Sequence, residues 1–309
     1  MARLSQNQKE IIKTVIFFIV IGVLGFYYCV YPLSRTKAAL GRINVDDYVP
    51  DSIHVNDPSL FVEAGLTADT FRVEADGLTT LACLYITAPV EADSVRGTVV
   101  LLHADTTDRT AMLPWAQEFI AAGYNAVVYD QRASGYSTGK YHGEGRYEAT
   151  DLDEVISWLD LRDRIVHPMV AIGATVGGDA TYLASLEEMR IDGIISIDPF
   201  LTTDRMWNVM KARHDMMWFP FFRTMMGWWY NIRSSYAAPD RELDDIEPVA
   251  VPSLFLVPDD ALAGPEVVRL KEESDNGLLT IEALPTDPPR LLERVMQFAG
   301  QIQRRPLEE

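Results

Sequence analysis

Hydrophobic residues follow two alternating patterns along most of this 309-residue chain. Short runs such as TVVLLH (98–103) and NAVVYD (125–130) are apolar at nearly every position, which is typical of strands buried on both faces of a parallel sheet. Segments between such runs, for example DLDEVISWLDLRD (151–163), carry apolar residues three or four positions apart and are expected to be helices with one buried face. The alternation predicts an α/β domain with a mostly parallel, twisted sheet and helices on both faces.

The ends of this pattern set the expected domain boundaries. Two strand-like runs flank Asp76-Gly77, a dipeptide suited to a tight hairpin turn, near the start of the pattern. The alternation stops after Pro199 and resumes at Ser253, so the residues between them include an insertion, which is rich in methionine and tryptophan. The predicted organisation is a tail and anchor at 1–35, a polar linker at 36–69, the α/β domain at 70–303 with the insertion at about 201–247, and a C-terminal tail at 304–309.

An uncharged segment of 21 residues, TVIFFIVIGVLGFYYCVYPLS, lies between Lys13 and Arg35. As a helix it would rise roughly 30 Å, which matches the hydrocarbon thickness of a bilayer. The alternatives are a cleaved signal peptide and a buried core helix, but no small-residue cleavage site follows and the run is long for a core helix. We therefore expect a single-pass N-terminal anchor in contact with the lipid bilayer.

The sequence constrains less strongly on which side of the membrane the soluble domain lies, because basic residues flank both ends of the anchor. They are Arg3, Lys9 and Lys13 before it and Arg35, Lys37 and Arg42 after it. A short basic N-terminal tail more often stays in the cytoplasm while the following domain is translocated. The soluble domain is therefore expected on the non-cytoplasmic, periplasmic side.

Charge and cysteine content exclude several classes of function. The net charge of −18, from 27 basic and 45 acidic residues, argues against nucleic-acid binding, which requires a basic surface. Cys29 and Cys83 are the only cysteines, so no internal disulfide framework is expected. The sequence has no cluster with metal-ligand spacing and no cofactor motif, so we expect neither a metal nor a cofactor.

The segment GATVGG (173–178) lies between a predicted strand and a predicted helix, where hydrolases place a nucleophilic serine within G-x-S-x-G. Thr175 occupies the serine position. Gly173, Gly177 and Gly178 are expected to serve the sharp turn and the close packing of the helix, with or without catalysis. A phosphate-binding loop is the weaker interpretation, because both the dinucleotide fingerprint and a Walker lysine are missing.

Two further motifs complete a resemblance to a known family. YDQRASGYSTG (129–139) is similar to the D-x-R-G-x-G-x-S-x-G turn of the α/β-hydrolase superfamily, and IEPVAVPSLFLV (246–257) is similar to that family's approach to its acid residue. With the hairpin, the elbow and the insertion, these motifs make residues 70–303 resemble the membrane-anchored serine hydrolases of the monoglyceride lipase and serine aminopeptidase type. The resemblance implies an α/β-hydrolase fold in which the insertion forms a helical lid.

The resemblance also implies positions for a catalytic base and its acid partner, and this chain departs from the family at both. The histidine position falls in ALPTDPPR, on Thr286 and Asp287. The acid position aligns with Ala261, and a one-residue shift is needed to make it Asp260. Asp259 or Asp260 is thus either a remnant of the acid or a solvated loop residue.

The loop after the first parallel strand departs from the family as well. It reads His103-Ala104-Asp105 where the family usually has His-Gly, and His103 is expected at a supporting position. A carboxylate at Asp105 would oppose the negative charge that develops on an oxyanion. Without an imidazole base, the Thr175 hydroxyl is expected to be a poor nucleophile.

These departures predict a pseudoenzyme, an α/β-hydrolase fold without active catalytic residues. We expect an accessory or interaction subunit of a membrane protein complex. The alternatives are a binder of lipid or another apolar ligand under the lid, and an ester or lipid hydrolase that uses Thr175. Methionine and aromatic side chains are adaptable contact groups, although burial against the sheet or contact with the bilayer would also explain them. The candidate contact residues in the insertion are Trp207, Trp218, Phe221, Phe222, Trp228 and Trp229.

Overall fold

The computed structural model describes residues 5–41, 67–217, 221–234 and 241–305. The chain divides into two compact units. The sheet unit comprises Arg42–Met206 and Ala238–Glu309, and the anchor unit comprises Met1–Gly41 and Trp207–Ala237. Most of the predicted insertion is therefore grouped with the N-terminal helix rather than with the sheet.

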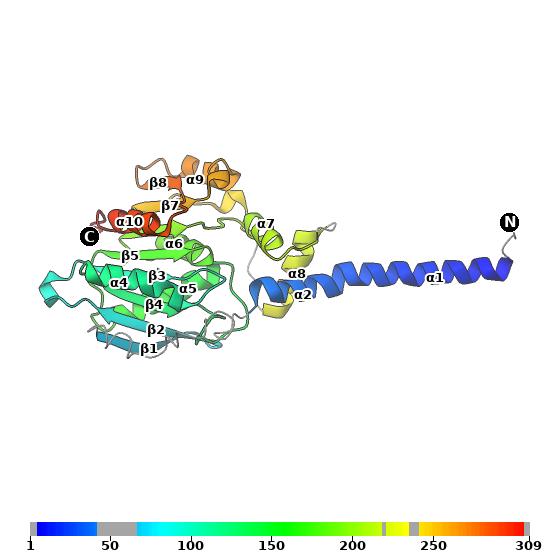
Figure 1. Cartoon of the computed structure of the whole chain (residues 1–309), viewed down its shortest axis with the longest axis horizontal. Coiled ribbons are helices and arrows are strands. Elements are labelled where there is room, and N and C mark those ends of the chain that lie inside the picture. The colour runs from blue at the N-terminus through cyan, green and yellow to red at the C-terminus, as the bar shows by residue number, and fades with distance from the viewer. Residues whose placement is uncertain (1–4, 42–66, 218–220, 235–240, 306–309) are drawn as a thin grey trace. The chain divides into compact units, whose positions relative to one another are not determined.

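The sheet unit contains an eight-stranded sheet with the strand order β1-β2-β4-β3-β5-β6-β7-β8 (Figure 1). The pairs β1–β2 and β2–β4 are antiparallel, and all other pairs are parallel. This confirms the predicted hairpin and the predicted parallel strands. The strands are β1 (Thr67–Asp76), β2 (Thr79–Thr87), β3 (Thr98–Leu102), β4 (Asn125–Asp130), β5 (Met169–Ala174), β6 (Gly193–Ile197), β7 (Ser253–Val257) and β8 (Leu279–Ala283).

Helices cover both faces of the sheet, as the pattern predicts. Successive strand residues point to opposite faces, so Val100 and Leu101 of β3 belong to two different cores. Val100 packs in the core that α5, α6 and α9 cover, and Leu101 packs in the core that α4 and α10 cover. The helices are α4 (Leu113–Ala121), α5 (Arg146–Asp160), α6 (Val176–Glu187), α9 (Pro265–Glu273) and α10 (Pro288–Ala299).

Helix α5 begins five residues before the apolar periodicity that predicted it. Its first turn is polar, and it is fixed by Glu148, whose carboxylate accepts hydrogen bonds from the backbone N–H groups of Gly143 (2.6 Å) and Gly145 (2.8 Å). Gly145 precedes the helix with φ 85°, a conformation that favours glycine. The start is therefore set by turn chemistry, which a hydrophobic pattern does not report.

The anchor unit is helical within the part of the chain that the structure describes. Helices α1 (Gln6–Gly25) and α2 (Tyr31–Leu40) are joined by a π-helical turn, Phe26–Val30. The continuous helix Gln6–Thr36 has 31 residues and is long and apolar enough to cross a membrane. Its apolar side chains are exposed, as Phe18 illustrates at 65%. The predicted membrane-spanning helix is thus supported by its length and composition.

Two helices come from the insertion, α7 (Thr203–Arg213) and α8 (Phe222–Ser234). Of the candidate contact residues, Trp207 and Phe222 are buried, with ring centroids 6.5 Å apart, whereas Phe221 and Trp228 are exposed. Trp229 is partly buried, and Trp218 lies outside the described residues. Helix α8 packs against α2.

Candidate functional site

The predicted elbow joins β5 directly to α6 through Thr175. Thr175 has φ 47° and ψ −112°, a strained conformation for a β-branched residue. The glycines around it are required by backbone contacts. A Cβ atom at Gly173 would lie 2.0 Å from the carbonyl oxygen of Gly177, and one at Gly177 would lie 2.7 Å from that of His103. The strand-to-helix turn of a nucleophile elbow is therefore present, with threonine at its apex.

The Thr175 hydroxyl is bound by Asp105, from the loop after β3. Thr175 Oγ1 donates a hydrogen bond to Asp105 Oδ1 at 2.6 Å and accepts one from the backbone N–H of Asp105 at 3.1 Å. Among the described residues, both hydrogen-bond partners of this hydroxyl belong to Asp105. Hydrolases of this fold use an N–H of the same loop as an oxyanion donor. Here such an N–H is directed at the threonine oxygen instead.

The sequence interpretation did not anticipate this contact, because it considered Asp105 only as a charge opposed to an oxyanion. The strand register contains the missing signal. β3 and β5 are parallel neighbours, and Leu102 is paired with Gly173. Residues two or three positions beyond that pair therefore emerge side by side at the same edge of the sheet, which brings Asp105 to Thr175.

His103 is buried, and both of its ring nitrogens hydrogen-bond to backbone groups. Its Nε2 accepts a hydrogen bond from the backbone N–H of Gln131 at 2.9 Å, so the ring proton is on Nδ1, which donates to the Ala104 carbonyl at 2.7 Å. Burial lowers the pKa of His103 to about 4. The ring is therefore neutral at pH 7, and both of its nitrogens hold the backbone at the ends of β3 and β4.

The positions expected to carry the acid and the base are on the surface. Asp259 and Asp260 are exposed in a short turn after β7. Thr286 and Asp287 are exposed after β8, where Asp287 precedes α10 and lies 3.8 Å from Arg290. Within the described part of the chain, none of these four side chains hydrogen-bonds to Thr175. The prediction that they are degenerate catalytic positions stays a prediction.

Asp179, one helical turn after the elbow, is a buried carboxylate that the sequence interpretation missed. It accepts hydrogen bonds from the backbone N–H groups of Phe200 (3.0 Å) and Leu201 (2.7 Å) and from Arg241 Nη1 (2.9 Å). It therefore holds the turn after β6 against α6. A charged residue in the otherwise apolar start of α6 was the available signal, because a buried carboxylate requires such partners.

The YDQRASGYSTG turn after β4 is held by two buried carboxylates. Arg132 forms a bidentate pair with Asp151 of α5, with distances of 2.8 and 2.6 Å. Asp130 accepts hydrogen bonds from the backbone N–H groups of Arg109 and Tyr136, both at 2.9 Å. The most specific local match to the hydrolase family is thus a structural network rather than a catalytic one.

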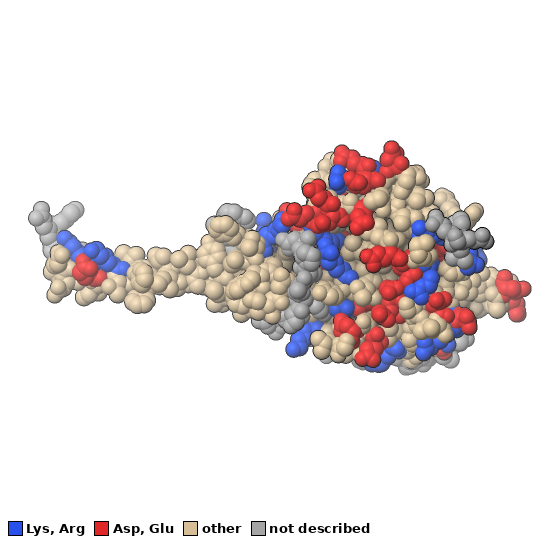
Figure 2. All heavy atoms as spheres, turned by 180° about the vertical axis from the view of Figure 1, so that it is seen from behind, with Lys and Arg blue, Asp and Glu red and all other residues tan. Residues whose placement is uncertain are grey.

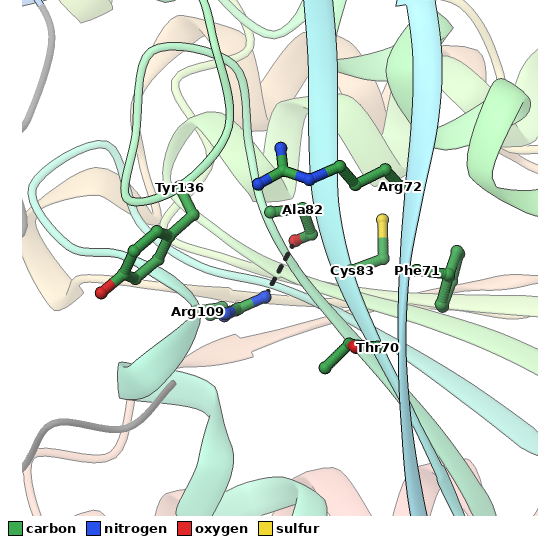
Figure 3. A pocket seen from close by; sticks show the side chains of 7 residues that line it. All are labelled: Thr70, Phe71, Arg72, Ala82, Cys83, Arg109 and Tyr136. Carbon is green, nitrogen blue, oxygen red and sulfur yellow. Dashed lines mark hydrogen bonds between the residues drawn. The ribbon is translucent and has the colours of Figure 1, made fainter. Parts of the chain in front are cut away.

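A pocket of about 430 Å³ lies over β1 and β2. Figure 3 shows the Arg72 and Arg109 side chains and the Tyr136 ring around Ala82, whose carbonyl oxygen accepts a hydrogen bond from Arg109 Nη1 at 3.2 Å. The seven lining residues drawn there include neither the elbow nor any residue of the insertion. This pocket is therefore not the apolar space under a lid that the sequence interpretation considered.

Comparison with known sequences gives two partial matches. Residues 79–178 match the family model of X-Pro dipeptidyl-peptidases (S15 family). A segment of 62 residues is 36% identical to the uncharacterized protein YqkD of Bacillus subtilis (strain 168) and covers 20% of this chain. The match also spans only 20% of that relative's length.

Solved structures match over most of the chain. The Pyrococcus furiosus esterase Pf2001 has 20% sequence identity and a TM-score of 0.60, and the match covers 82% of this chain and 98% of the esterase. A thermophilic esterase from Thermogutta terrifontis has 15% identity and a TM-score of 0.52, with 76% and 99% covered. The Pyrococcus horikoshii acylaminoacyl peptidase has 14% identity and a TM-score of 0.54, with 82% and 44% covered. The chain therefore has the α/β-hydrolase fold that the resemblance implied, and at these identities the likeness concerns the fold alone.

Proposed function

We propose that this protein is a membrane-anchored α/β-hydrolase-fold subunit that does not hydrolyse esters and acts as an accessory component of a membrane protein complex. One observation carries the non-catalytic part of the proposal: Asp105 binds the Thr175 hydroxyl through both its carboxylate and its backbone N–H. An active elbow needs its hydroxyl directed at a base and an oxyanion donor left open for substrate.

The electrostatics of the loop after β3 also disfavour acyl transfer. A tetrahedral intermediate on Thr175 would place a developing oxyanion next to the Asp105 carboxylate, which raises the energy of the transition state. Among the described residues, no imidazole hydrogen-bonds to Thr175, and the neutral ring of His103 is held by the backbone. These features support a fold kept for binding rather than for hydrolysis.

Hydrolysis through Thr175 is the second candidate, and two observations favour it. The distance of 2.6 Å between Thr175 Oγ1 and Asp105 Oδ1 suits proton transfer to a carboxylate base. The elbow also keeps a strained conformation, and strain of this kind is often found at functional sites. We rank this candidate below the first because a carboxylate is a weaker base than an imidazole and its charge opposes the oxyanion.

Assembly in native membranes tests the accessory role. The full-length chain and a Thr175→Ala variant would be extracted in mild detergent, and their complexes compared for protein and lipid content. An accessory subunit should recover the same membrane proteins, in a fixed ratio, with and without Thr175. Recovery of a lone chain, or of lipid without protein, would contradict the accessory role, and the latter result would favour the apolar-ligand alternative.

The periplasmic side is part of the proposal and rests on the short basic N-terminal tail. Protease added outside spheroplasts should digest the domain beyond residue 38. Full protection of the domain while the inner membrane is intact would place it in the cytoplasm instead.

A further inference from the structure

Helix α8 of the insertion is packed on the helix that forms the anchor. Thr36 is buried, and its Oγ1 lies 4.0 Å from the sulfur of Met226 in α8. The Tyr31 hydroxyl accepts a hydrogen bond from the backbone N–H of Met217, just before α8. The insertion is therefore attached to the anchor by specific side-chain contacts within one compact unit.

A tryptophan of α8 makes another of these attachments. The indole Nε1 of Trp229 donates a hydrogen bond to the backbone carbonyl of Tyr28 at 3.1 Å. A hydrogen bond is stronger where water is excluded, so this bond stabilises the contact between α8 and the anchor.

The position of this bond along the anchor sets the level of α8. Tyr28 lies seven residues before Arg35, the first charged residue after the apolar segment, which is roughly 10 Å along a helix. Trp229 therefore contacts the anchor inside its uncharged stretch and near the end of it. If the uncharged segment spans the hydrocarbon core, this level lies roughly 10 Å inside the edge of the core, a depth that the apolar face of an interfacial helix reaches.

Helix α8 has two apolar faces, and the described residues cover only one of them. Phe222, Met226 and Tyr230 are buried at four-residue spacing. Phe221 next to the helix start and Trp228 and Ile232 within it share another face, and they are exposed by 73%, 51% and 52%. A contiguous open apolar face of this kind indicates a contact with lipid or protein.

The charge of this segment contrasts with the charge of the whole chain. Residues 207–234 contain four basic residues (Lys211, Arg213, Arg223 and Arg233) and one acidic residue (Asp215), whereas the chain has 45 acidic and 27 basic residues. Figure 2 shows carboxylates over the visible face of the sheet unit and an uncharged length of the N-terminal helix. This local excess of basic charge suits anionic phospholipid headgroups.

We propose that α8 is a second membrane contact of this protein, lying at the boundary between the headgroups and acyl chains of the bilayer that holds α1. Phe221, Trp228 and Ile232 contact the parts of the acyl chains next to the headgroups, and the local excess of basic charge favours anionic lipid. The hydrogen bond from Trp229 to the Tyr28 carbonyl fixes the depth of the helix. This inference rests on the membrane anchor in the proposed function, but not on the absence of catalysis.

Nitroxide labels on the full-length protein in nanodiscs test the position of α8. A Cys29→Ala background removes the exposed native thiol, and Cys83 is buried. Labels would be placed by Ile232→Cys on α8, by Phe18→Cys on α1, and by Leu161→Cys as a matched control, an apolar residue of the sheet unit that is 82% exposed. The measurement is the collision rate of each label with dissolved oxygen relative to a water-soluble nickel complex.

In nanodiscs that contain anionic phospholipid, the oxygen-to-nickel ratio at position 232 should exceed the ratio at position 161 severalfold and approach that at position 18. Equal ratios at 232 and 161, with a high ratio at 18, would overturn the inference and leave the anchor intact. Low ratios at all three positions would overturn the anchor as well. Dipolar broadening between labels at 232 would also overturn it, because a second copy would then cover this face.

Discussion

The turn after β4 and the elbow after β5 lie on either side of β3, and buried carboxylates have different roles in these two regions. In the turn, Asp130 accepts hydrogen bonds from backbone N–H groups and Asp151 pairs with Arg132, so both carboxylates hold the shape of the chain. In the elbow, Asp105 binds the hydroxyl of Thr175, the residue at the nucleophile position. The first arrangement suits any protein with this fold, and the second suits a protein that does not use Thr175 as a nucleophile.

This difference shows which residues the fold needs. A buried polar group without a partner destabilises the folded state whatever the protein does, so the network after β4 is needed even in a pseudoenzyme. A catalytic base is not needed in this way for the stability of the folded state. The positions after β7 and β8 are exposed, and another residue type there leaves no buried group without a partner.

Removal of one partner from the turn network should have the largest effect. Asp151→Ala removes the bidentate partner of the buried Arg132 guanidinium and should lower the free energy of unfolding by about 3 kcal/mol or more. Urea denaturation would measure the change. Arg290→Ala removes an exposed pair with Asp287 and serves as the control, with no measurable loss. A loss below about 1 kcal/mol for Asp151→Ala would mean that the network is not needed for stability.

The buried histidine should make the protein sensitive to acid. The pKa of His103 is about 4 in the folded state and near the ordinary value of 6.5 when unfolded, so the unfolded state binds more protons between these values. The free energy of unfolding should therefore fall as the pH drops from about 6.5 to about 4, by about 3 kcal/mol in total.

A His103→Gln variant, measured in parallel, separates this contribution from that of the carboxylates. The difference in the free energy of unfolding between the parent and His103→Gln should change by about 3 kcal/mol between pH 6.5 and pH 4. A difference that stays constant with pH would contradict the buried neutral imidazole.

Two glycines in the elbow should differ in their tolerance of a methyl group. A Cβ atom would lie 2.0 Å from the Gly177 carbonyl oxygen at Gly173, but 3.2 Å from its closest neighbour at Gly178. We expect Gly173→Ala to destabilise the protein by about 1–3 kcal/mol and Gly178→Ala to be close to neutral, because alanine also favours the helix. Thermal unfolding of both variants checks the comparison, and equal losses would show that the elbow backbone relaxes around either methyl group.

Conversion of the elbow residue to serine should have the smallest effect. Thr175→Ser keeps the hydroxyl beside Asp105 and supplies no imidazole, so it should have no measurable esterase activity; general base catalysis typically contributes about 10²- to 10⁴-fold in rate. The assay would use short acyl esters with the parent as reference. Turnover well above the parent would reveal a base and an oxyanion donor that the geometry described here lacks.

The fold could be predicted from the sequence because burial determines the spacing of apolar residues. A strand buried on both faces is apolar at nearly every position, and a helix buried on one face is apolar every three or four residues. The predicted segment 125–130 coincides with β4, and the Asp76-Gly77 turn joins β1 to β2. The elbow could be predicted from its glycines instead, because close backbone contacts require Gly173 and Gly177.

Contacts between distant side chains could not be predicted in this way. The bond between Thr175 and Asp105 depends on the register of β3 and β5 and on two side-chain conformations. The spacing of Phe222 and Met226 indicates a buried face on α8, but it does not say that the anchor helix covers it. The hydrogen bond from Trp229 Nε1 to the Tyr28 carbonyl joins residues about 200 positions apart, beyond the reach of any local pattern.

A fluorophosphonate probe distinguishes an inactive Thr175 hydroxyl from an active one, because the probe labels only hydroxyl groups that are activated as nucleophiles. The parent, a Thr175→Ala variant and an active serine hydrolase would be treated side by side. Because Asp105 binds the Thr175 hydroxyl, we expect no labelling of either the parent or the variant under conditions that label the active enzyme completely. Labelling of the parent that disappears in Thr175→Ala would contradict the account, since it would show that Asp105 activates Thr175 instead of occupying it.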